Sequence, residues 1–146
     1  MEWDQGVEQR HPTWRALVES QQDSTVAPSL LRQSREAKIL TVNEATQSFL
    51  LAVTAANIGA HDLAISLFAR LDSLPLSLDR VDVGWGLRSL SYLLRAREYE
   101  ANQDTSSTVE FYQRFIDAWS RADSLTIPLI EEAQRSMQRY ERGSHK

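Results

Sequence analysis

The chain has 146 residues and a mass of 16.7 kDa, which is enough for one domain with a single buried core. Hydrophobic residues make up 42% and charged residues 25%, an ordinary globular composition that excludes disorder of the whole chain. The lack of cysteine excludes disulfides, thiolate metal sites and cysteine nucleophiles. The net charge of −4 and the scatter of arginines among acidic residues argue against nucleic-acid binding.

The start of the chain gives no targeting signal. Residues 1–12 are polar and acidic and lack the apolar core of a secretory signal, so we read them as a flexible N-terminus. The longest near-apolar stretch, residues 49–56, is too short to cross a bilayer. We therefore expect no membrane association and a cytoplasmic location.

We expect one helical domain over residues 13–142. Thr13 can cap a short helix that runs to about Gln21, and Pro28 suits the first turn of another helix that ends near Leu40. Residues 143–146 are expected to be a flexible C-terminus.

The next two helices are predicted at about residues 44–58 and 61–72. Asn43 is a good N-cap, and Gly59 stands where a left-handed residue ends a helix. The first helix is apolar over a wide arc, which is typical of a helix packed on more than one side.

A long connection over residues 73–83 follows, and its leucines and valines suggest a loop laid on the body of the protein. Gly84 and Gly86 flank Trp85, which we expect to mark the entry of a helix over about residues 85–102.

Two more helices complete the chain. One begins at Asp104 and Thr105, where Ser107 and Glu110 have capping-box spacing although Asp104 is the better cap. The last runs over residues 126–142, with apolar residues at three- and four-residue spacing, and ends at Gly143. No useful segment alternates with period two, so the sequence predicts an all-α fold.

The two central hairpins match each other at a spacing of 44 residues. Small residues, a turn residue, an aromatic and an apolar residue recur in the same order. The pairs are Ala52 and Ala96, Ala55 and Tyr99, Gly59 and Gln103, Ala64 and Thr108, Phe68 and Tyr112, Leu71 and Phe115. Small residues allow close helix approach, and the aromatic fills the gap to the next helix.

This pattern resembles the tetratricopeptide repeat (TPR). The resemblance covers about residues 45–120, with repeats at about 45–75 and 87–120. The stretch from Tyr99 to Trp119 and the residues after it look like the last repeat of the TPR tails of bacterial multidomain regulators. The resemblance to the TPR implies antiparallel hairpins stacked as a short right-handed superhelix, closed by a capping helix at 126–142. The chain departs from the pattern in three ways. Gln103 stands where the turn glycine is usual, and Thr108 replaces a small alanine. The spacing of 44 residues between the hairpins also exceeds the usual repeat length of about 34 residues.

The residues show no set of groups that converge for catalysis. His11, His61 and His145 have no partner at metal-ligand spacing, and the glycines around Trp85 lack the context of a phosphate loop. Glu131 and Glu132 point to different sides of a helix, and we expect them to be solvated and paired with Arg135. The aromatic residues of the helix that begins at Thr105 recur at the helical spacing expected of side chains buried in the core. We expect no enzyme activity, no cofactor and no metal.

The resemblance implies that the first helix of each hairpin lines a concave, protein-binding face. These positions are mostly apolar and equally suit internal packing. The candidates are Thr46, Phe49, Leu50, Val53 and Asn57 in the first repeat, and Leu90, Leu93, Leu94, Arg97 and Glu100 in the second.

Two hypotheses of function remain. The first is a scaffold or adaptor that binds a protein segment or a neighbouring domain, with a homodimer as a further possibility. The second is the ligand-sensing regulatory tail of a bacterial kinase or transcriptional activator, which predicts an enclosed pocket near Trp85 and residues 73–83.

Overall fold

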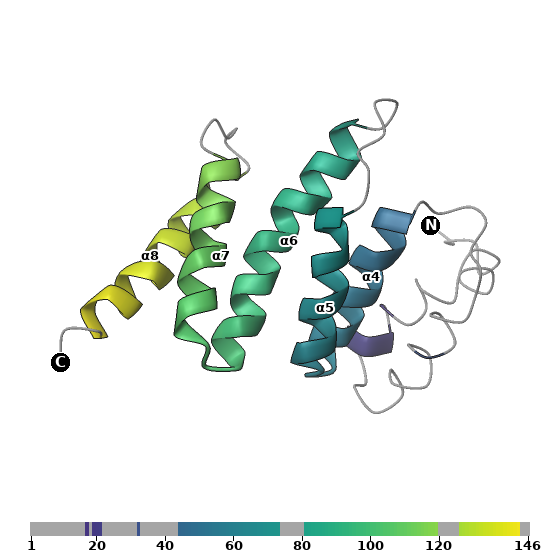
Figure 1. Ribbon diagram of the computed structural model, residues 1–146, viewed down its shortest axis with the longest axis horizontal. Helices are drawn as coiled ribbons and strands as arrows, with labels where there is room; N and C mark the ends of the chain where they lie inside the picture. The colour runs from purple at the N-terminus through teal and green to yellow at the C-terminus, as the bar shows by residue number, and fades with distance from the viewer. Residues whose placement is uncertain are drawn as a thin grey trace, which may run out of the picture. The chain divides into compact units, whose positions relative to one another are not determined.

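The computed structural model describes residues 17, 19–21, 32, 44–73, 81–119 and 126–143. These residues are helical or lie in turns, and none of them forms a strand, so the all-α prediction is confirmed (Figure 1). The described helices are α4 (Glu44–Asn57), α5 (His61–Ser73), α6 (Val81–Ala101), α7 (Thr105–Ala118) and α8 (Ile127–Gly143).

The chain divides into two compact units, Met1–Pro75 and Leu76–Lys146. The division falls in the connection between the two predicted repeats. Each unit therefore holds one hairpin, α4–α5 in the first and α6–α7 in the second. The stacking of the hairpins into a superhelix stays a prediction.

The turns of the two hairpins are built from the same hydrogen bonds. In the first, Gly59 N–H donates to Ala56 C=O and Ala60 N–H donates to Ala55 C=O, both at 2.9 Å. This pair of bonds is a Schellman motif, which satisfies carbonyls left open at the end of a helix. Gly59 has a φ of +74°, the left-handed conformation that the motif requires.

In the second hairpin, Gln103 N–H donates to Glu100 C=O and Asp104 N–H donates to Tyr99 C=O, both at 3.0 Å. Each bond lies 44 residues beyond its counterpart. Gln103 takes the glycine position with a φ of +61°. The predicted pairing of Gly59 with Gln103 is thus confirmed in backbone geometry, although glutamine rarely adopts this conformation.

The paired side chains also have matching burial. The small residues at the helix crossings, Ala52 and Ala64 in unit 1 and Ala96 and Thr108 in unit 2, are all 0% exposed. A larger side chain at these positions would push the helices apart. The Thr108 hydroxyl donates to Asp104 C=O at 2.7 Å, so its polar group is satisfied within the helix.

Aromatic residues fill the space beside these crossings. Phe68 and Tyr112 are fully buried, and Phe49 packs edge-on against Phe68 with ring centroids 5.7 Å apart. In unit 2, Phe111 and Phe115 join Tyr112, Leu93 and other residues in one core. This confirms that the aromatic cluster of α7 is core.

The N-terminus of α7 confirms the predicted cap. The Asp104 carboxylate accepts the backbone N–H of Ser107 at 3.1 Å and its hydroxyl at 2.7 Å. These hydrogen bonds stabilise the charged form and hold the pKa of Asp104 below its usual value.

The start of α6 differs from the sequence prediction. The helix begins at Val81, so residues 81–83 and the three residues from Gly84 to Gly86 lie inside it rather than in a loop and at a helix entry. A glycine in a helix costs only about 1 kcal/mol relative to alanine, which packing of a 21-residue helix can offset.

Several predictions concern residues outside those described. They include the flexible ends at 1–12 and 144–146, most of the helices before residue 43, the connection at 74–80 and the packing of Trp85. Of the predicted helix 13–21, the described residues 17 and 19–21 are helical.

Candidate functional site

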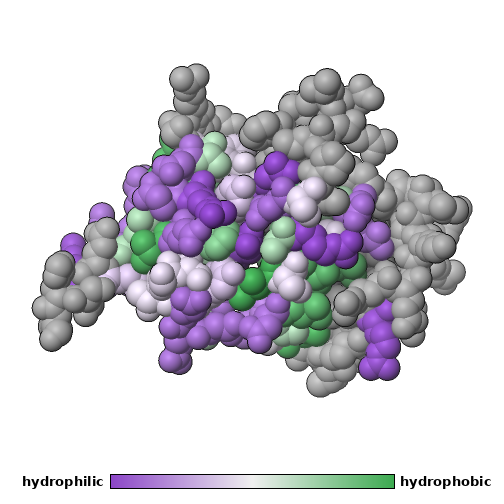
Figure 2. Space-filling model, viewed as in Figure 1, coloured by the Kyte–Doolittle hydropathy of each residue, from purple (hydrophilic) through white to green (hydrophobic). Residues whose placement is uncertain are grey.

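The candidate face of the first repeat lies along α4 and is partly covered. Thr46, Phe49 and Val53 are half-buried, while Leu50 is buried. In unit 1, half-buried apolar side chains continue onto α5, and Figure 2 shows hydrophobic residues gathered over these two helices.

The fifth residue of this set, Asn57, is exposed and contacts a segment from earlier in the chain. Its amide donates to the Ser20 hydroxyl at 3.1 Å, and that hydroxyl donates to Leu17 C=O at 2.7 Å. Ser20 is itself buried. No sequence pattern indicates this contact, since the two residues are 37 positions apart.

The apolar candidates of the second repeat belong largely to the core of unit 2. Leu93 is 1% exposed, and Leu90 packs against the same core. Leu94 is half-buried. Internal packing, which the sequence left open as an alternative, is therefore what the structure shows for Leu93 and Leu90.

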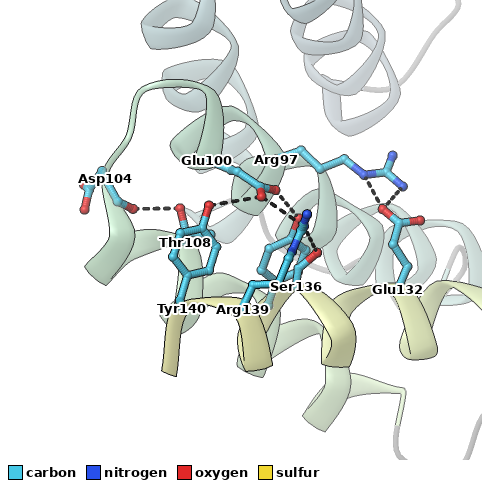
Figure 3. Close-up of polar contacts among 9 residues, drawn as sticks. Arg97, Glu100, Asp104, Thr108, Glu132, Ser136, Arg139 and Tyr140 are labelled. Carbon is cyan, nitrogen blue, oxygen red and sulfur yellow. Dashed lines mark hydrogen bonds and ion pairs between the residues drawn. The ribbon is translucent and has the colours of Figure 1, made fainter. Parts of the chain in front are cut away.

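Arg97 forms an ion pair with α8. Its Nε and Nη2 donate to Oε1 of Glu132 at 3.1 and 2.7 Å, and both side chains are about 40% exposed (Figure 3). The expected pairing of Glu132 with Arg135 is therefore wrong, although Glu131 is exposed as expected. Arg135 Nε instead donates to the backbone carbonyl of Glu131 at 3.2 Å.

Glu100 is the centre of a polar cluster that joins three helices of unit 2. Its Oε2 accepts from the Tyr112 hydroxyl at 2.8 Å, and its Oε1 accepts from the Tyr140 hydroxyl at 3.0 Å and from Arg139 at 3.2 Å. Arg139 also donates to the Ser136 hydroxyl at 2.9 Å. One carboxylate thus joins α6, α7 and α8 (Figure 3). We call these residues, with Arg97 and Glu132, the α8 clamp.

The clamp shifts the pKa of two tyrosines. Burial, followed by the contact with Glu100, raises the pKa of Tyr112 to about 12. Burial and the same carboxylate raise the pKa of Tyr140. Both hydroxyls are therefore neutral donors at physiological pH. Such groups orient a carboxylate, but they supply neither a base nor a nucleophile for catalysis.

The partners of Arg97 and Glu100 could not be predicted from the sequence. Tyr140 belongs to the three- and four-residue apolar pattern of α8, and Arg139 lies next to it in the sequence. A weak signal exists in hindsight, because tyrosine hydroxyls and arginines beside an apolar stripe are suited to reach a carboxylate on a neighbouring helix.

In the part of the chain that the structure describes, no three His, Asp or Glu residues lie together as a metal site. No described helix is both long and apolar enough to cross a membrane. The pocket predicted near Trp85 falls on residues whose side chains lie outside the description. No protein-family model, curated protein or solved structure matches the chain.

Proposed function

We propose that this chain is a non-catalytic, cytoplasmic protein-binding module made of helical hairpins of the tetratricopeptide type. The observation that supports the proposal best is the repeated hairpin. Its turn bonds, its buried small residues and its buried aromatic recur at 44-residue spacing. Repeated hairpins of this kind commonly serve as extended binding surfaces.

The surface that fits a partner best is the α4 face in unit 1. Thr46, Phe49 and Val53 keep part of their surface exposed along one side of the helix. Apolar groups that remain partly exposed on a rigid helix suit the docking of an apolar protein segment. In unit 2 Leu90 and Leu93 pack in the core and Arg97 and Glu100 bond to α8, so we assign primary binding to unit 1.

The experiment compares two substitutions in the same hairpin. Val53→Arg puts a charge on the α4 face, and Ser66→Arg puts the same charge on an exposed polar residue of α5. Purified wild-type and variant chains would each serve as the bait in affinity capture, and the amount of each captured protein would be measured relative to the bait. Circular dichroism would establish that both variants are folded.

We expect a protein captured in stoichiometric amount by the wild type to be lost with Val53→Arg and kept with Ser66→Arg. Loss with both variants alike would remove the α4 face as the binding surface. If the wild type captures no protein in stoichiometric amount, the proposal that the chain is a protein-binding module is wrong.

A further inference from the structure

We draw no further inference here: the strongest candidate, the aromatic patch of unit 2 in which the half-buried Tyr92 and Tyr99 lie against Phe111, carries none because nothing in the structure shows what covers it.

Discussion

Gln103 holds a backbone conformation that its counterpart Gly59 adopts freely. Its φ is +61°, against +74° for Gly59, and both turns carry the same two backbone hydrogen bonds. A side chain in the left-handed region costs about 1–2 kcal/mol. The second hairpin therefore contains local strain that the first does not.

Replacing Gln103 with glycine should stabilise the protein. Relief of the left-handed strain is offset in part by the greater freedom of glycine in the unfolded chain, so we expect a gain of about 0.5–1 kcal/mol. Chemical denaturation measures the change. The reverse substitution, Gly59→Gln, should destabilise by a similar amount, because a Cβ at Gly59 meets no atom within 4 Å and only the backbone conformation is penalised.

An unchanged or lower stability of Gln103→Gly would contradict this account. It would mean that the glutamine side chain, which is exposed, contributes contacts that offset its backbone strain.

Ionisation of Tyr112 should lower the stability of unit 2 at alkaline pH. Its pKa is near 10 in the unfolded chain and about 12 in the folded protein. The stability that its neutral hydroxyl contributes is therefore fully present below pH 10 and is lost as the pH rises through about 12. The cause is burial of the phenol, reinforced by the adjacent Glu100 carboxylate.

Tyr112→Phe should cost about 1 kcal/mol at pH 7, since Glu100 loses a donor, and should flatten the fall of stability between pH 10 and 12. Denaturant titrations at several pH values give both quantities. Phe115→Leu, at a fully buried residue of the same core that carries no ionisable group, serves as the control and should keep the wild-type slope. An equal alkaline slope in all three proteins would rule out Tyr112 as the titrating group.

At the scale of the element, α7 depends on its first turn. Asp104 accepts two hydrogen bonds from Ser107 and lies directly after the strained turn residue. The cap thus fixes the point at which the chain reverses from α6 into α7. Neither helix could be shifted along the chain without losing this arrangement.

Asp104→Ala should destabilise the protein, because it removes the N-cap hydrogen bonds of α7. Asp104→Asn keeps an accepting oxygen and should be closer to the wild type in stability than Asp104→Ala. Thermal unfolding of the three proteins under the same buffer conditions compares them. Equal losses in both variants would point to the charge rather than the hydrogen bonds.

At the scale of the whole molecule, the question is whether two compact units act as one domain. Each unit contains one repeated hairpin, joined in unit 2 by α8, and a single repeat buries too little apolar surface to be stable alone. The sequence analysis predicts one domain over residues 13–142. We therefore expect the units to unfold together.

Phe68→Ala tests this coupling, because Phe68 is fully buried in unit 1. The substitution should destabilise by about 3–5 kcal/mol. Native-state hydrogen exchange should then show lower protection in α6, α7 and α8 as well as in α4 and α5. Wild-type protection in α6–α8 alongside losses in α4 and α5 would mean that the units fold independently.

The sequence by itself determined what depends on local interactions. Helix periodicity, caps and stop residues placed both ends of α4, α5 and α8 and the start of α7 within one or two residues. The 44-residue match identified Gln103 as the turn residue because small, turn and aromatic positions recur in fixed order. Such signals act over a few residues, and the chain carries them in its residue types.

The tertiary structure decided the rest. Helix α6 begins at Val81 and includes Gly84 and Gly86, because the packing of a long helix outweighs the low helix propensity of two glycines. The partners of Asn57, Arg97 and Glu100 lie 35 to 40 residues away along the chain. No periodic pattern specifies which charged side chain meets another at such a distance, because that depends on how α8 and the segment around Ser20 pack against the hairpins.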